Sequence, residues 1–400
     1  MFKEPDIKLF EECEAIDRQF ERRGLVYHDA AVEKHLADIA APLVPGAPLE
    51  RVTWRFRILR DPLVNAFALP NGSVYVNTGL IARLENDDQL AGVLAHEIAH
   101  AANRHAYAFN RKLRRDTVVM EALGIGMNGP FAPMGVAGDV NPAVASWAAQ
   151  GYGRTMEEEA DRTALERMKQ TGRDPAQLAR MLAVLDSRLD SAPVPMFWHD
   201  HPMRRISSVK KALALTHDVP AGADDGYIDR MRPALIQSIQ LGLDSRCFRS
   251  ALAAAQRLVQ ATPDNPESLF WLGESYRALG PRTPLPSHAE LDVWGRLSAS
   301  RHIVTRTEEE DAKKLASTVG GRAALAENRA RAEEAYRKAA ALDATQALPH
   351  LGLGMLFEQE GKTDLAQAAY RKYLEISPEG TDRERVERRI ASLGSKGETK

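Results

Sequence analysis

Residues 86–105 read NDDQLAGVLAHEIAHAANRH, and this stretch decides the fold because it places a polar motif inside an apolar helical pattern. Asn86 predicts the N-cap of the helix, and Gln89, three residues on, is the expected reciprocal partner. His96 and His100 are four residues apart. On a helix they project from one face and can share a metal ion, and neutral imidazole suits Zn²⁺.

Glu97 lies between the two histidines in sequence. A helix rotates it by about 100° from His96, so it is expected beside the metal rather than on it. There a carboxylate can take a proton from the attacking water and later return it to a leaving amine. A five-residue motif also occurs by chance, as two helix histidines and a surface glutamate. The apolar residues around the motif argue against that alternative, because buried rings need partners.

A catalytic zinc site needs a third protein ligand and one open position. The continuation typical of metzincins would need Gly at 103 and His at 106, whereas this chain has Asn103 and Ala106. His105 lies five residues past His100, off the shared face, and is expected to be a structural histidine. The third ligand is therefore expected from another segment.

The sequence GRTMEEEADRTA at residues 153–164 offers a candidate. Glu157 and Asp161 are four residues apart and share a helical face. A carboxylate at Glu157 can bind Zn²⁺, and Asp161 can accept the other ring N–H of a ligand histidine and so select its tautomer. Three contiguous glutamates also fit a solvated acidic helix face, and these residues alone leave both interpretations open.

HEIAH followed by RTMEEEAD resembles peptidase family M48, and the similarity covers roughly residues 50–210. It includes NAFALPNGSVYVNTGL ahead of the metal helix and the pair Arg104-His105. The resemblance implies one Zn²⁺ per chain held by His96, His100 and Glu157. It also implies Glu97 as the general base and Asp161 as a support behind the ligands.

The same resemblance implies further roles near the site. Arg154 could stabilise negative charge or pair with a nearby glutamate. His201, in the family's His-Pro motif, could contact substrate, steady the oxyanion or plug the open metal position, or be only a loop histidine. Arg205 follows that motif two residues sooner than is usual in the family. An extended substrate is expected to pair with an exposed strand edge, at Ala66, Phe67, Ala68 and Leu69.

The predicted fold class is α+β, with a mostly helical, zincin-like protease domain of the gluzincin type over residues 1–224. Helical spacing covers residues 6–22 and 31–39, and VTWRFRIL at 52–59 alternates as a half-buried strand. Apolar runs on both sides of residues 70–73, Pro-Asn-Gly-Ser, predict a β-hairpin. Residues 124–142 and 193–202 are expected to be loops and candidate lids.

Residues 225–400 are Ala-rich and predict an all-α domain of tetratricopeptide (TPR)-like repeats of about 34 residues. Leu353-Gly354 and Tyr370 occupy repeat positions, and Leu272-Gly273 repeats the register upstream. The second helix of that upstream copy resumes around Tyr336, which predicts an insertion at about residues 281–327. A plain helical bundle is the alternative. Stacked repeats commonly present a concave surface that holds a protein partner.

The composition limits the classes of partner and compartment. The formal net charge of −2 provides no global basic field for nucleic acid. Two cysteines, Cys13 and Cys247, exclude a disulfide framework. No apolar run is long enough to span a membrane, and the charged start at residues 3–12 does not resemble a secretory signal.

The expected function is zinc-dependent endopeptidase action on protein or peptide substrates, with the repeats recruiting a substrate or partner. Family members with such repeats act in the bacterial periplasm or cell envelope on misassembled proteins, so the resemblance implies that location and a possible envelope association. The visible start of the chain would instead fit the cytoplasm. The alternative function is a repeat-based chaperone or adaptor whose protease site is closed or regulated.

Overall fold

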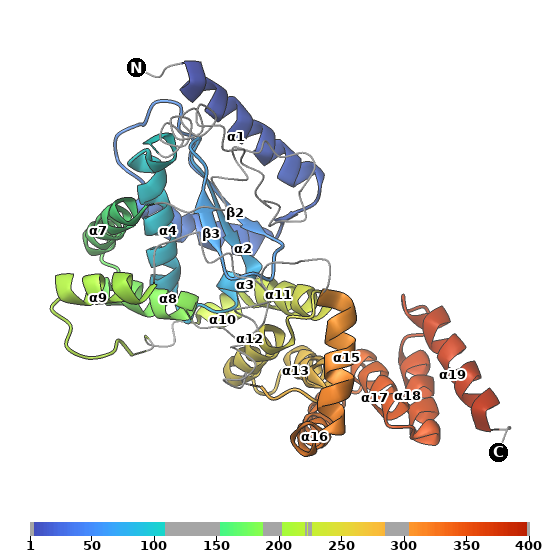
Figure 1. The fold of residues 1–400 in the computed structure, drawn as a ribbon. Coiled ribbons are helices and arrows are strands. Elements are labelled where there is room, and N and C mark those ends of the chain that lie inside the picture. The colour runs from blue at the N-terminus through green and yellow to red at the C-terminus, as the bar shows by residue number, and fades with distance from the viewer. Residues whose placement is uncertain are drawn as a thin grey trace, which may run out of the picture. The chain divides into compact units, whose positions relative to one another are not determined.

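The computed structural model describes residues 4–108, 153–186, 202–220, 222, 226–284 and 304–397. Figure 1 shows the ribbon with the element labels used below. The chain forms two compact units, the first ending at Ser238 and the second running from Ile239 to the C-terminus. Along the chain, the boundary between the units falls within helix α11 (Arg232–Asp244), later than the boundary after residue 224 that composition predicts.

A four-stranded sheet lies in the first unit, in the order β1-β2-β4-β3. Its strands are β1 (Val26–Tyr27), β2 (Arg55–Leu59), β3 (Ala66–Ala68) and β4 (Ser73–Asn77). β2 and β4 run parallel, and both edge strands pair antiparallel with their neighbours. β3 and β4 form the predicted hairpin. The predicted fold class is confirmed: a mostly helical protease unit with a small mixed sheet.

Helices surround this sheet and carry the candidate ligands. They are α1 (Glu4–Arg22), α2 (Ala30–Ala40), α3 (Thr78–Ile81), α4 (Asp87–Ala102), α7 (Arg154–Gln170), α8 (Ala176–Asp186), α9 (Pro202–Ala212) and α10 (Tyr227–Arg230). α4 is buried at every position from Gln89 to Ala101 and packs against α7, α8 and β3. The bounds of α1 and α2 confirm the helices that the sequence predicts at residues 6–22 and 31–39.

A buried aspartate joins α1 to the hairpin. Asp17 is 5% exposed and accepts hydrogen bonds from Asn71, Ser73 and Tyr75 at 2.8, 2.7 and 2.5 Å. Burying a carboxylate is costly unless hydrogen bonds compensate it. These three donors supply that compensation and hold α1 on the strands behind the metal helix.

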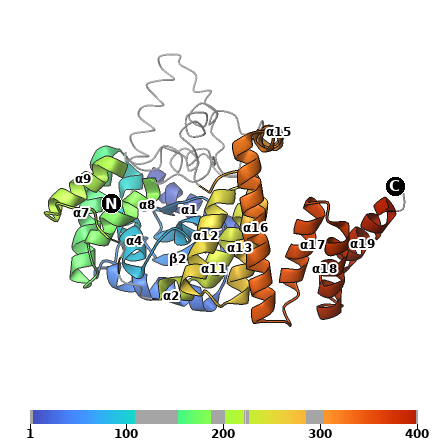
Figure 2. The same ribbon diagram turned by 90° about the horizontal axis from the view of Figure 1, so that it is seen from below.

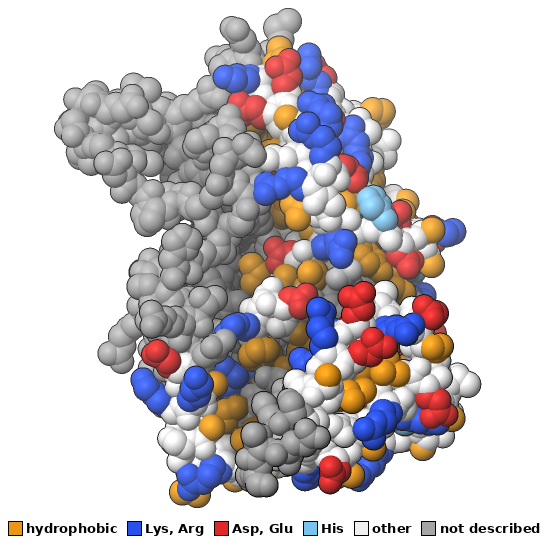
Figure 3. Space-filling view, turned by 90° about the vertical axis from the view of Figure 1, so that its right-hand side faces the viewer, with side chains coloured by type: hydrophobic (Ala, Val, Ile, Leu, Met, Phe, Trp, Pro, Cys, Tyr) orange, Lys and Arg blue, Asp and Glu red, His pale blue; other side chains and the backbone are white. Residues whose placement is uncertain are grey.

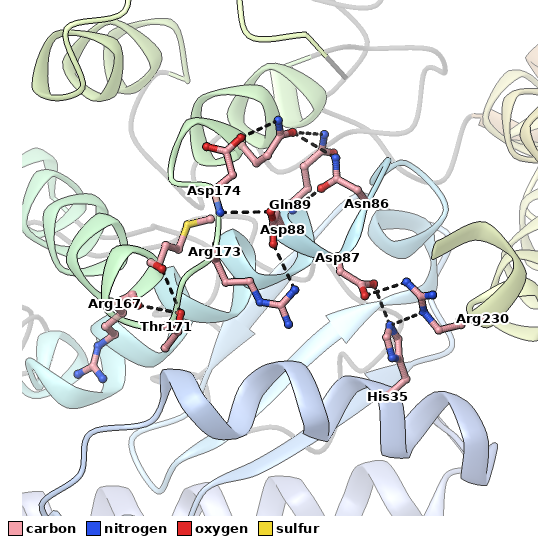
Figure 4. A network of polar contacts seen from close by, with 12 residues as sticks. His35, Asn86, Asp87, Asp88, Gln89, Arg167, Thr171, Arg173, Asp174 and Arg230 are labelled. Carbon is pink, nitrogen blue, oxygen red and sulfur yellow. Dashed lines mark hydrogen bonds and ion pairs between the residues drawn. The ribbon is translucent and has the colours of Figure 1, made fainter. Parts of the chain in front are cut away.

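The N-terminus of α4 is held by a network of polar contacts (Figure 4). Asp87 accepts from His35 on α2 at 2.8 Å and from Arg230 on α10 at 2.8 Å. Asp88 accepts a hydrogen bond at 3.2 Å from Arg173, which lies in the connection between α7 and α8. Acidic side chains are stabilised at a helix N-terminus by the helix dipole. The metal helix is therefore tied at its start to three other segments.

The predicted cap of α4 forms with one difference. Asn86 accepts from the backbone N–H of Gln89 at 2.8 Å, as expected. The Gln89 side chain accepts instead from the backbone N–H of Glu85, at 2.9 Å, rather than returning to Asn86. Gln177 on α8 lies 3.1 Å from Gln89 Nε2, so the cap also binds the next helix.

All regular secondary structure in the described residues of the second unit is α-helical. Its helices are α12 (Phe248–Ala261), α13 (Pro266–Leu279), α15 (Val304–Ser317), α16 (Val319–Leu342), α17 (Leu348–Gln359), α18 (Thr363–Ile376) and α19 (Arg383–Gly397). Neighbouring helices pack in chain order, and α13 lies beside α16 (Figure 2). This pairing across residues 281–327 is the one that the predicted insertion requires.

Glycines at the proposed repeat positions meet tyrosine rings. A Cβ on Gly273 would lie 2.5 Å from Tyr336, and one on Gly354 would lie 2.4 Å from Tyr370. Both tyrosines are fully buried. Such close packing supports the TPR-like prediction. The later part of the predicted insertion is itself helical, since α16 begins at Val319; that segment is rich in Ala, Glu and Arg, which are strong helix formers.

The charged side chains on the face drawn in Figure 3 are mixed in sign. Figure 3 shows Lys and Arg interspersed with Asp and Glu, with hydrophobic side chains between them. Many charges in the described residues pair along single helices, as Arg331 does with Glu327 at 2.8 Å. None of the helices in the described ranges is both long and apolar enough to cross a membrane.

Substitution of Gly354 by alanine should destabilise the second unit by about 1–3 kcal/mol, because the new methyl group overpacks the Tyr370 ring. That ring has little freedom to move, since its hydroxyl donates to Glu358 at 2.6 Å. Urea unfolding followed by circular dichroism measures the change. Gly320→Ala is the matched control, because nothing lies within 4 Å of a Cβ there. Equal stability of the two variants would contradict the close packing.

Candidate metal centre

Three side chains from two helices converge beneath the protein surface. His96 and His100 come from α4 and Glu157 from the first turn of α7, and one ligand atom of each lies within 4.8 Å of the others. Their exposed fractions are 3%, 0% and 0%. The four-residue spacing on α4 places both rings on the face that packs against α7. Residues far apart in sequence thus meet at one buried point.

Two of the three distances match those of ligands around a tetrahedral divalent ion, and the distance between the two imidazole nitrogens is shorter. His96 Nε2 lies 2.9 Å from His100 Nε2, and Glu157 carboxylate oxygens lie 3.4 Å from each of these nitrogens. Ligands about 2.0–2.1 Å from a tetrahedral Zn²⁺ are separated by about 3.3–3.5 Å. Two imidazoles and one carboxylate form a donor set that zinc favours, so the residues present fit the ion.

Asp161 contacts His96 on the side away from Glu157. Its Oδ1 lies 3.0 Å from His96 Nδ1, the ring nitrogen opposite the one that faces Glu157. This contact assigns Nδ1 to the carboxylate and makes Nε2 the ligand atom. Burial and Arg205 lower the pKa of His96, but hydrogen bonds to Asp161 and Glu157 outweigh them and raise it to about 9. A metal ion must therefore displace a proton there.

Arg205 is the residue that the sequence analysis did not assign. It lies on α9, is 2% exposed, and binds Asp161 through two nitrogens at 2.9 and 2.6 Å. Its Nη1 also lies 3.1 Å from Glu157. Burial raises the pKa of Asp161, but the Arg205 charge outweighs it and holds that pKa well below its usual range. The one feature of this arginine visible in the sequence is that it follows the His-Pro motif two residues sooner than is usual in the family.

The structure reassigns the role that was considered for Arg154. This side chain is 65% exposed and donates to Glu158 at 2.9 Å, which matches the alternative of pairing with a nearby glutamate. The guanidinium that contacts Asp161 belongs to Arg205 instead. Arg154 is the first residue of α7, about two turns before Asp161, and its side chain lies in solvent.

The proposed substrate strand occupies an edge of the sheet, but its side chains are not exposed. β3 is the edge strand next to α4, and Ala66, Phe67, Ala68 and Leu69 are all at most 9% exposed. Phe67 packs on Tyr75, with ring centroids 5.2 Å apart. The expectation of an exposed edge is therefore corrected, because these residues are buried with their backbone included.

The remaining predicted residues divide into two groups. Glu97 lies on α4 and is 3% exposed, within the same buried region as the ligands. His105 is buried at 3% and contacts His100. His201, the candidate loops at 124–142 and 193–201, and residues 143–152 lie outside the described residues.

Comparison with known proteins agrees with this geometry. Residues 28–213 match the model of peptidase family M48. These residues form an M48 peptidase domain. The chain is 29% identical to a putative beta-barrel assembly-enhancing protease of Vibrio cholerae over 291 residues, which are 63% of this chain and 60% of that protein.

Other relatives of the M48 domain come from different lineages. A beta-barrel assembly-enhancing protease of Escherichia coli K12 is 28% identical over 55% of this chain and 44% of its own length. A mitochondrial metalloendopeptidase OMA1 of Arabidopsis thaliana is 26% identical over 55% and 45%. The chain thus spans about half of the length of the curated relatives that it matches. M48 peptidases depend on a metal, which agrees with the ligand cluster in this domain.

Replacement of Asp161 by asparagine should weaken Zn²⁺ binding by about 10- to 100-fold, because His96 loses the carboxylate that orients it. Competition with a chromophoric chelator measures the affinity. Glu158→Gln, on the same helix but 48% exposed, serves as the control and should bind like the parent protein. Unchanged affinity in the Asp161 variant would remove this residue from the metal centre.

Proposed function

We propose that this chain is a Zn²⁺-dependent endopeptidase that hydrolyses peptide bonds of protein substrates, with one ion per chain. The observation that carries the proposal is the convergence of His96, His100 and Glu157 in a buried cluster. The M48 domain match and the curated relatives, which are named as proteases, support it. The Zn²⁺ assignment rests on the two imidazoles and one carboxylate.

A bound Zn²⁺ would act as a Lewis acid toward the scissile carbonyl and lower the pKa of the attacking water to about 7. Glu97 is positioned to take the proton of that water. It follows His96 directly on α4 and shares its burial, so a carboxylate stands beside the ligand face. The same carboxyl group then passes the proton to the nitrogen of the departing amine. Arg205 holds the Asp161 and Glu157 carboxylates in place through ion pairs during this exchange.

We propose that the backbone of β3 holds an extended substrate once this edge is uncovered, since Ala66 and Ala68 are at most 5% exposed in the structure. In the β3–β4 ladder, Leu69 bonds to Ser73 and Asn77 bonds to Asn65, each through the backbone. Because hydrogen-bonded pairs alternate in an antiparallel ladder, the N–H and C=O groups of Ala66 and Ala68 point away from β4. Pairing through these groups would tolerate many substrate sequences, since it uses main-chain bonds. The buried side chains would fix this edge beside α4.

His201 keeps the roles that the family resemblance suggests. We propose that it contacts the substrate, the oxyanion or the open metal position, as the residue directly before α9. α9 carries Arg205 into the metal centre. This connection brings the start of α9 close to the ligands and favours a role for the loop before it.

The biological role that we propose is quality control of misfolded or misassembled envelope proteins. The similarity to beta-barrel assembly-enhancing proteases of bacteria supports this role and a location in the periplasm or cell envelope. The cytoplasm is the alternative location. We further propose that the TPR-like unit recruits the substrate or a protein partner.

Glu97→Gln should retain Zn²⁺ and lose casein cleavage by about 10²–10⁴-fold, because glutamine cannot accept the proton. Metal analysis and a protease assay on the same preparation separate the two effects. His96→Ala is the companion variant and should lose both metal and activity. Undiminished cleavage by the Glu97 variant would exclude this residue as the base.

Removal of residues 245–400 separates cutting from recruitment, since it leaves α11 whole. If the repeats recruit protein, cleavage of a short peptide should persist while KM for an unfolded protein substrate rises. The alternative, an adaptor with a closed site, predicts the opposite change, with peptide cleavage rising on removal. Circular dichroism of the shortened chain provides the folding control.

A further inference from the structure

A second histidine contact lies behind the metal ligands, and the proposed mechanism does not use it. His105 Nδ1 lies 2.9 Å from His100 Nδ1, and the His105 side chain is 4% exposed. We propose that His105 is a positioning residue, which accepts the Nδ1 proton of His100 and thereby holds His100 Nε2 toward the metal. This inference rests on the proposed metal site.

A turn after the end of α4 places His105 beside His100. In a continuous helix, five residues would rotate it about 140° away from His100. α4 instead ends at Ala102, and Arg104 adopts a left-handed backbone with φ 59°. Tyr107 and Ala108 then bond back to the Arg104 carbonyl and begin a new turn. Left-handed backbone is unfavourable for a residue with a side chain, and such strain is concentrated where a site requires it.

When His100 binds a metal ion, only one placement of the protons on the two rings allows a hydrogen bond between their Nδ1 atoms. His100 Nε2 faces His96 and Glu157, at 2.9 and 3.4 Å, so it is the ligand atom. A coordinating imidazole carries its proton on the other nitrogen, which makes His100 Nδ1 the donor. His105 Nδ1 must then accept, and the His105 proton must sit on Nε2.

That second proton faces an acidic side chain at ion-pair distance rather than in a formed hydrogen bond. His105 Nε2 lies 3.5 Å from Oε2 of Glu159, whose side chain is 45% exposed. Glu159 lies on α7 between the ligand Glu157 and the supporting Asp161. The two ligand histidines would thus be oriented from the same helix, His96 directly by Asp161 and His100 through His105 by Glu159. A neutral ring in the second path adds no further charge to the cluster.

The test compares substitutions that keep or remove the acceptor at one atomic position. His105→Asn places its amide oxygen where Nδ1 was, whereas His105→Gln reaches only the Nε2 position and His105→Leu removes both polar atoms. Zn²⁺ affinity is measured by chelator competition on the full chain. We expect Leu and Gln to weaken binding by about 10- to 100-fold and Asn to stay within a few-fold of the parent.

The outcomes separate positioning from packing. A merely structural role would lower the melting temperature of the metal-free protein equally for Asn and Leu, and their Zn²⁺ affinities would match. Either parent-like affinity in His105→Leu or equal loss in Asn and Leu overturns the inference. If the Leu variant does not fold, the comparison of Gln with Asn decides in the same way. A parent protein that binds no Zn²⁺ would overturn the proposed function itself.

Glu159 is tested by charge removal without loss of volume. Glu159→Gln should weaken Zn²⁺ binding by less than His105→Leu, since it acts through one more side chain. In the His105→Leu background the same substitution should have no further effect, as a double-mutant cycle requires for coupled residues. Glu158→Gln again provides the neighbouring control. Additive losses from the two sites would overturn the link between Glu159 and His105.

Discussion

The buried contact between α4 and α7 is the constraint on which the protease unit depends. From Leu90 onward α4 is apolar except for its motif residues, and α7 brings Glu157 and Asp161 to meet them. Polar groups withdrawn from water must find partners, so each helix requires the other. His96 satisfies this requirement by contacting Glu157 through one ring nitrogen and Asp161 through the other.

The charges of this contact are balanced by α9. Glu157 and Asp161 are both buried carboxylates, and Arg205 reaches each of them at 3.1 Å or less. A buried ion pair is stabilising only when its geometry is good and its remaining hydrogen bonds are made, and the two-point contact with Asp161 meets that condition. The ligand set is thus assembled by the protein's own side chains. Such preorganisation reduces the rearrangement that metal binding would require.

The second unit packs two helices together across a long intervening segment. Gly273 of α13 and Tyr336 of α16 are in close contact, although residues 281–327 separate their helices in sequence. The entropy of closing a loop grows only slowly with its length, so packing that joins the two helices can outweigh the added residues. Tyr336 also donates to Glu274 on α13 at 2.5 Å, which adds a polar link to the same pair.

Local sequence patterns determined much of the fold, for identifiable physical reasons. Helical spacing and Asn86 located the metal helix, and a turn sequence between apolar runs located the β3–β4 hairpin. These features depend on residues within a few positions of one another. His96 and His100 could be paired as ligands for the same reason. Glu157 needed more, because the acidic run around it fits a solvated face equally well until the resemblance to M48 peptidases is considered.

Tertiary structure alone decided the residues that complete the centre. Arg205 lies on α9, where no sequence motif predicts a buried cation. Its role therefore follows only from its contact with Asp161. Arg154 belongs to the same motif but is exposed and pairs with Glu158. His105 meets His100 through a left-handed turn that helical periodicity does not foresee. Spacing predicts neighbours along a regular element, whereas contacts across a turn or between elements depend on how the chain packs.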